Sequence, residues 1–145
     1  MVKYFTLEEA KGILPKVEKL VKKLLQLKAA ILTISSIDIT YYSDEEELIN
    51  LTRSNKEFHR LSFKFYKTLE DFNKIGCILK DLDYGLVDFY SQHNRKDILL
   101  CWRIGEPDIE YWHDLESGFT GRRPIIELEN PVEEEYQEHE DKYDI

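Results

Sequence analysis

Hydrophobic residues in the first half of the chain repeat at helical spacing. One run alternates steps of four and three residues, with lysines at 16, 19, 22, 23 and 28 between them: Ile13, Val17, Leu20, Leu24, Leu27, Ile31 and Ile34. A second run shows the same alternation: Leu48, Leu51, Asn55, Phe58, Ser62, Phe65, Leu69 and Phe72. This spacing is that of a coiled-coil seam, so we expect two long helices that pack as an antiparallel hairpin over about residues 7–74.

Local signals predict where these helices begin. Thr6 and Ser43 each stand three residues before a glutamate, which is the pattern of a capping box. Gly12 and Pro15 interrupt the first run, and Pro15 lacks the amide proton that a helix interior needs. We therefore expect the first helix to kink or restart near residue 14.

After Gly76 the hydrophobic pattern changes to strand-like alternation. Short strands are predicted at 77–80, 85–91, 96–104 and 109–113, and the turn signal His93-Asn94-Arg95 predicts a β-hairpin. If that hairpin closes symmetrically, one face carries Val87, Phe89, Leu100, Trp102 and Ile104, and the other carries Leu86, Asp88, Tyr90, Leu99, Cys101 and Arg103. The first face should form the core. The fold class is therefore expected to be α+β, a long antiparallel helix hairpin packed on a small antiparallel sheet of three or four strands within residues 77–126.

Charge divides the chain into two parts. Residues 127–145 hold nine acidic residues and a single lysine, and so contribute −8 to a net charge of −9. Residues 1–126 are nearly neutral and are expected to form a single domain, while 127–145 is expected to be an acidic, disordered tail or a cover for a basic groove. A nearly neutral body is not expected to bind nucleic acid. The chain shows no signal segment and no apolar run long enough for a membrane, so a cytoplasmic protein is expected.

The cysteines and histidines give no metal pattern. Cys77 and Cys101 lack the C-x-x-C spacing and are expected to be reduced and buried, with a bridge between them left open. The four histidines are not paired at metal-binding spacing: His59, His93, His113 and His139. We therefore expect no metal and no cofactor.

Arginines supply the main candidates for a binding site. Arg103 is expected to lie diagonal to Asp88 and near Glu110, either as a cross-strand charge pair or as a guanidinium whose free donors meet an anion. Arg122 and Arg123 follow two glycines in Gly118–Pro124, a loop that suits a phosphate or carboxylate. Alternatively, these two arginines pair with Glu116, Asp114 or the acidic tail.

His113 is the one catalytic candidate. It stands between Trp112 and Asp114, and a carboxylate that orients an imidazole can raise its basicity for acid–base chemistry. The alternative is a half-buried histidine that is bonded to the backbone. A nucleophilic role for Cys101 is not favoured, because its apolar flanks predict a buried thiol.

Several of these segments together resemble a known family. They are YFTLEEA (4–10), GLVDF (85–89), LLCWRIGE (99–106), YWH (111–113) and GFTGRRP (118–124). Over residues 4–124 the chain resembles the small prokaryotic family catalogued as domain of unknown function 2203. The resemblance favours a role for Arg103, but the family supplies no activity to transfer.

The sequence thus predicts a binding module more than an enzyme. Its site would group Asp88, Arg103, His113, Arg122 and Arg123 and bind a small anion or an acidic group of a partner. One alternative is a hydrolase-like enzyme in which His113 moves a proton while arginines stabilise an oxyanion. Another is a structural protein that forms a homodimer through the helical hairpin.

Overall fold

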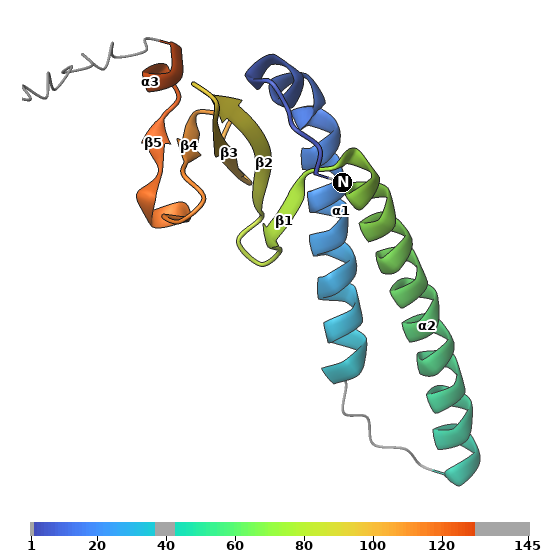
Figure 1. Ribbon diagram of the computed structural model, residues 1–145. Coiled ribbons are helices and arrows are strands. Elements are labelled where there is room, and N and C mark those ends of the chain that lie inside the picture. The colour runs from blue at the N-terminus through green and yellow to red at the C-terminus, as the bar shows by residue number, and fades with distance from the viewer. Residues whose placement is uncertain (1, 37–42, 130–145) are drawn as a thin grey trace, which may run out of the picture.

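The computed structural model describes residues 2–36 and 43–129. Its elements, in chain order, are α1 (Leu7–Ser36), α2 (Asp44–Ile75), β1 (Ile78–Asp81), β2 (Leu86–His93), β3 (Lys96–Arg103), β4 (Tyr111–His113), the 3-10 helix η1 (Phe119–Gly121), β5 (Arg123–Pro124) and α3 (Ile126–Glu129). The two long helices run antiparallel, and the sheet lies beside one end of them, so that their other end projects away from the sheet (Figure 1). The predicted α+β class is confirmed.

The predicted helix caps are present. The amide of Glu9 donates to the Thr6 hydroxyl at 3.1 Å, and the amide of Glu46 donates to the Ser43 hydroxyl at 3.1 Å. Gly76 ends α2 with a left-handed φ of 97°, a conformation that suits glycine. The expected restart near residue 14 does not occur, because α1 continues through Pro15 as one helix.

α1 buries a wider stripe than the predicted seam. Val17, Leu24 and Leu27 are buried as expected, but Leu14 and Val21 are buried as well. The reason is that α1 packs on two partners: residues of α2, such as Phe72, and residues of the sheet belong to the same core cluster as α1. A helix with two neighbours needs more than one apolar row.

The predicted seam of α2 holds only near the sheet. The residues that α2 buries are Leu61, Thr68, Phe72 and Ile75. Leu48 and Leu51, at the end of α2 away from the sheet, are 66% and 47% exposed. The prediction that they pack against the first helix is therefore wrong.

The sheet is antiparallel, and its strands follow chain order from β1 to β5. β2 and β3 pair so that Asp88 lies opposite Cys101 and Leu86 opposite Arg103, the register expected from a symmetric hairpin. The turn between them has two residues, Asn94 and Arg95, both with positive φ. The sheet has five strands and not three or four, because Arg123 and Pro124 pair with β4 as a strand too short to show any alternation.

The two faces of the sheet have different surroundings. Val87, Phe89, Leu100 and Trp102 share the core cluster with residues of α1, so this is the face that the helices cover. Asp88, Cys101 and His113 lie on the other face by strand alternation.

The end of the described chain remains attached to the core. α3 follows β5, and its Leu128 is partly buried against the core cluster. Of the predicted acidic tail, 127–145, the first three residues belong to α3, and the part from residue 130 onward lies outside the described residues and stays a prediction.

Candidate functional site

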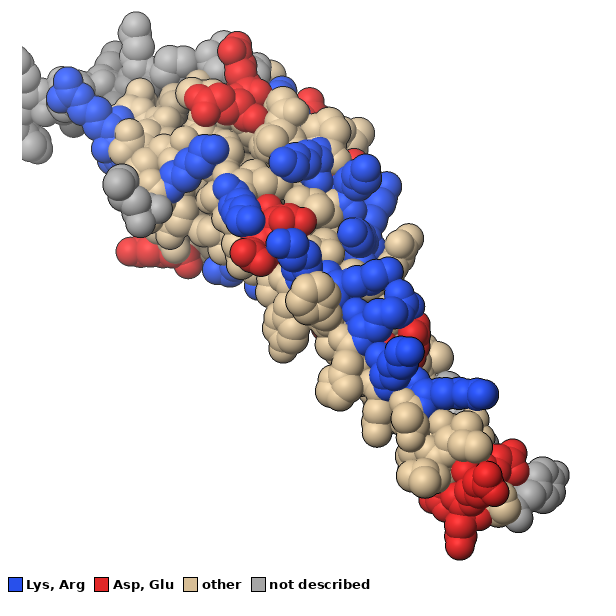
Figure 2. All heavy atoms as spheres, turned by 90° about the vertical axis from the view of Figure 1, so that its right-hand side faces the viewer, with Lys and Arg blue, Asp and Glu red and all other residues tan. Residues whose placement is uncertain are grey.

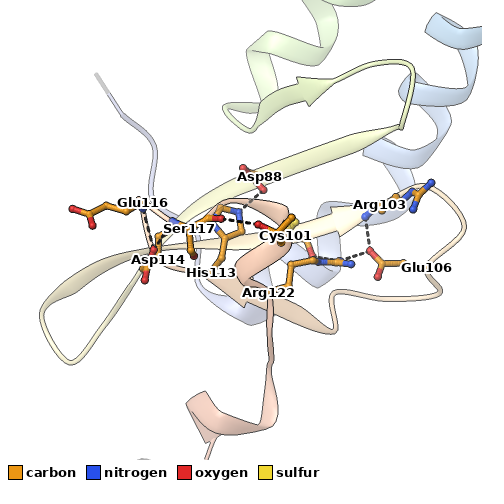
Figure 3. Close-up of polar contacts among 10 residues, drawn as sticks. Asp88, Cys101, Arg103, Glu106, His113, Asp114, Glu116, Ser117 and Arg122 are labelled. Carbon is orange, nitrogen blue, oxygen red and sulfur yellow. Dashed lines mark hydrogen bonds and ion pairs between the residues drawn. The ribbon is translucent and has the colours of Figure 1, made fainter.

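Three reactive side chains are buried together on the sheet face opposite α1. Asp88 of β2 faces Cys101 of β3, and His113 of β4 pairs with Leu99 in the next row of the sheet. The residues are 1%, 0% and 2% exposed, respectively. One ligand atom from each (a carboxylate oxygen, a thiol sulfur and a ring nitrogen) lies within 4.8 Å of the other two. In Figure 3 the His113 ring points toward Asp88, with Cys101 beside it.

Both ring nitrogens of His113 have partners. Nε2 lies 3.2 Å from Oδ1 of Asp88, and Nδ1 lies 2.7 Å from the backbone carbonyl oxygen of Asp114. The contact with the Asp88 carboxylate raises the pKa of His113, although burial acts in the opposite direction. The imidazole is thus oriented by Asp88 and by the backbone of Asp114.

Both cysteines are free, buried thiols. Burial raises the pKa of Cys101 to about 12, with a further contribution from Asp88, and burial likewise raises the pKa of Cys77 to about 12. A neutral thiol is a poor nucleophile, so the structure offers no reactive cysteine for catalysis among the residues that it describes.

Arg122 is held by several contacts beside this cluster. Its Nη2 donates to Oε1 of Glu106 at 2.5 Å and to the backbone carbonyl of Cys101 at 3.3 Å. Its guanidinium carbon lies 4.0 Å from the ring centroid of Tyr111 and 4.6 Å from that of Phe119. The side chain is only 12% exposed. Arg122 therefore connects the segment between β4 and β5 to two places: the backbone of β3 at Cys101, and Glu106 in the turn after β3 (Figure 3).

Arg103 lies next to Arg122 but is exposed. Its guanidinium carbon lies 5.6 Å from the ring centroid of Tyr84 and 5.9 Å from that of Phe119. Its backbone amide donates to the same Glu106 oxygen that binds Arg122. Among the described residues, no carboxylate pairs with the guanidinium of Arg103. The carboxylate that reaches Arg103 is that of Glu106 and not of Glu110, and it bonds the backbone amide of Arg103.

Arg123 lies apart from the other candidates. Its guanidinium carbon is 5.4 Å from the ring centroid of Trp112, which belongs to the core side of the sheet. Arg123 also contributes to the lowered pKa of Asp114, after the larger effect of hydrogen bonds from Ser117 and Glu116. The Asp114 carboxylate accepts hydrogen bonds from the amides of Glu116 and Ser117 and so closes the turn after β4. The His113 ring contacts the backbone oxygen of Asp114 and not this carboxylate.

The predicted site residues thus form two neighbouring groups. Asp88 and His113 are bonded in the interior, and Arg103 and Arg122 share the Phe119 ring near the surface. Sequence reasoning missed Glu106, which lies three residues after Arg103 and accepts from the Arg103 amide and the Arg122 side chain. It placed Cys101 on the same face as Asp88 but left it outside the site, because the apolar flanks of Cys101 predicted a buried, unreactive thiol.

The arrangement has two chemical capabilities. The buried group offers nitrogen, oxygen and sulfur donors, a set that can bind a transition-metal ion. The surface group offers the guanidinium of Arg103 near two aromatic rings and without a carboxylate partner among the described residues, and such a group can bind an anion.

Comparisons with known proteins place the chain in one family. No curated protein and no solved structure matched the chain. None of the described helices is both long and apolar enough to cross a membrane. The model of one family, described as an uncharacterized conserved protein (DUF2203), matches residues 3–125 and so spans the helical hairpin, the sheet and both groups of site residues. The chain therefore belongs to the DUF2203 family.

Proposed function

We propose that this protein is a binding module for an anionic group and that Arg103 is its principal contact. The observation that carries the proposal is an exposed guanidinium near two aromatic rings, those of Tyr84 and Phe119, with no carboxylate partner among the described residues. Surface arginines are commonly paired or fully solvated, whereas this one is held in place while its donors remain free. Such a group suits a carboxylate or phosphate, to which arginine donates two parallel hydrogen bonds.

The surroundings of Arg103 support recognition of a partner group. Tyr84 and Phe119 are 62% and 40% exposed, and arginine, tyrosine and phenylalanine are enriched in binding interfaces. Glu106 neutralises Arg122 and not Arg103, because its Oε1 accepts from the side chain of Arg122 and only from the backbone of Arg103. Arg122 is therefore proposed to position Phe119, while Arg103 contacts the anion.

Anion titrations of the full-length protein test this proposal. We expect inorganic phosphate, citrate or an acidic peptide to raise the melting temperature, because a ligand that binds only the folded state stabilises it. Arg103→Ala should abolish the rise, and Arg103→Lys should retain a smaller one, since lysine keeps the charge but not the fork.

Arg53→Ala is the matched control, because Arg53 is an exposed arginine in the first third of α2, at the end that projects away from the sheet. This variant should respond to anions as the parent does. The proposal fails if no anion shifts the parent, or if Arg53→Ala removes the shift as fully as Arg103→Ala.

A second candidate function, self-association through the helical hairpin, rests on a separate observation. α2 carries apolar side chains that no part of the described chain covers: Leu48, Leu51, Phe63 and Tyr66 are 66%, 47%, 72% and 68% exposed. The distal end of α2 begins with four acidic residues, and basic side chains gather farther along the projecting helices (Figure 2). A second copy packed antiparallel would cover the apolar side chains and bring each acidic end near basic residues of the other copy.

The oligomeric state tests this second candidate. We expect a dimer in analytical ultracentrifugation, and Phe63→Glu should convert it to a folded monomer. Leu115→Glu, at a site that is 52% exposed and outside the helices, should leave the dimer intact. A parent protein that sediments as a monomer at high concentration would eliminate this candidate.

A further inference from the structure

The further inference concerns the buried group formed by Asp88, Cys101 and His113. Each residue comes from a different strand of an antiparallel sheet, so backbone pairing fixes their relative positions. All three side chains are almost completely buried. A carboxylate buried to this degree is unfavourable unless a cation or hydrogen-bond donors compensate its charge.

Hydrogen-bond chemistry shows what kind of partner the group requires. The carbonyl oxygen of Asp114 can only accept, so Nδ1 of His113, at 2.7 Å, must carry a proton. Nε2 then faces Oδ1 of Asp88 at 3.2 Å. If Nε2 carried only its lone pair, two acceptors would face each other, and they would repel. A positive charge must lie between them, either as a proton or as a metal ion.

The position of Cys101 favours the metal ion. A proton shared by His113 and Asp88 involves two side chains, whereas a metal ion takes a third ligand, and the sulfur of Cys101 lies within 4.8 Å of both ligand atoms. Around a tetrahedral zinc ion with bonds of about 2.0–2.3 Å, ligand atoms are separated by about 3.3–3.8 Å. The separation of Nε2 and Oδ1, 3.2 Å, is already close to that range, and the sulfur lies no more than 4.8 Å from either atom.

The charges and the donor types identify the class of metal. A carboxylate, a thiolate and a neutral imidazole carry two negative charges, which one divalent cation neutralises inside the protein. Nitrogen and sulfur donors suit zinc and similar transition metals, whereas magnesium and calcium prefer oxygen ligands. The hydrogen bond from Nδ1 to a backbone carbonyl is the usual outer contact of a metal-binding histidine, because it fixes the tautomer that leaves Nε2 free for the metal.

We infer that Asp88, Cys101 and His113 bind one divalent transition-metal ion of the zinc class. The three side chains supply three ligands, as in zinc sites that keep a fourth position for water or another ligand. This site is independent of the anion contact at Arg103, and it gives Asp88 and His113 a role different from anion binding.

Cobalt and zinc titrations test the inference. Full-length protein without a histidine tag is dialysed against a chelator and then titrated with Co²⁺. We expect one equivalent to bind, with the near-ultraviolet absorption of a cobalt–thiolate bond, and Zn²⁺ should displace the cobalt. Zn²⁺ at a hundredfold excess over its dissociation constant should raise the melting temperature by at least about 5 °C.

The chain offers a matched pair of cysteine variants. Cys101→Ser should remove the thiolate absorption and weaken zinc binding by roughly 100-fold or more. Cys77→Ser also alters a buried, free thiol and should leave both properties unchanged. Because the chain has only two cysteines, retention of the absorption in Cys77→Ser identifies Cys101 as the ligand even if Cys101→Ser does not fold.

Other outcomes would overturn the inference. Absence of stoichiometric cobalt binding by the parent would show that the group holds a proton and not a metal. Loss of the absorption in Cys77→Ser would place the thiolate elsewhere. Arg103→Ala should bind cobalt as the parent does, so failure of the anion proposal and failure of the metal inference give different results.

Discussion

Leu24→Asp is expected to unfold the protein. Leu24 lies in the middle of α1 and has no exposed surface. Replacing it removes a buried apolar side chain and places a carboxylate in the core, at a combined cost of about 5 kcal/mol or more, which is comparable to the whole stability of a small domain. Far-ultraviolet circular dichroism and thermal melting should show the loss of cooperative folding.

Leu32→Asp is the control for this prediction. Leu32 lies on the same helix but is 56% exposed, so the same change there should cost less than about 1 kcal/mol. If the two variants melt at similar temperatures, the burial of α1 between α2 and the sheet is wrong.

Arg122→Ala is expected to destabilise the protein strongly even without any ligand. The change leaves the carboxylate of Glu106, whose side chain is 17% exposed, without its cation. It also removes the donor to the Cys101 carbonyl and the contacts with Tyr111 and Phe119. Loss of one partner of a largely buried pair should cost about 2–4 kcal/mol, measured by chemical denaturation.

Arg123→Ala provides the comparison for Arg122. Arg123 is exposed, and its described contacts are the Trp112 ring and a long-range interaction with Asp114. Its replacement should cost less than about 1 kcal/mol. Equal effects of the two substitutions would contradict the structural role assigned to Arg122. The sequence alone does not separate these adjacent arginines, because Arg122 caps the end of η1 whereas Arg123 begins β5, and a strand of two residues shows no alternation.

The register of the β-hairpin is predictable from the sequence for a physical reason. The two-residue turn at Asn94–Arg95 fixes which residues face each other, and alternation then assigns every side chain to one face. Counting outward from this turn is therefore enough to place Asp88 opposite Cys101. The same counting misplaces Glu110, because the turn after β3 is not a tight hairpin and leaves the register of β4 undetermined.

Other features depend on contacts that no local pattern records. Leu14 and Val21 are buried because α1 meets the sheet as well as α2, whereas Leu48 lacks such a neighbour despite its heptad spacing. The group of Asp88, Cys101 and His113 spans three strands, with ligands 13 and 12 residues apart in the sequence. These intervals match none of the short spacings by which metal sites are recognised.

The order of the strands has a consequence for how the protein folds. Because the sheet runs from β1 to β5 in chain order, each strand can pair with the one synthesised just before it, without closing a long loop. The helical hairpin is equally local, so slow steps should be confined to the docking of these two units, for example the contact between the Phe5 amide and the Tyr90 carbonyl. The Asp88–Cys101–His113 group is complete only once β4 has paired with β3. A spectroscopic signal from that group would therefore report on the late assembly of the sheet and not on its first hairpin.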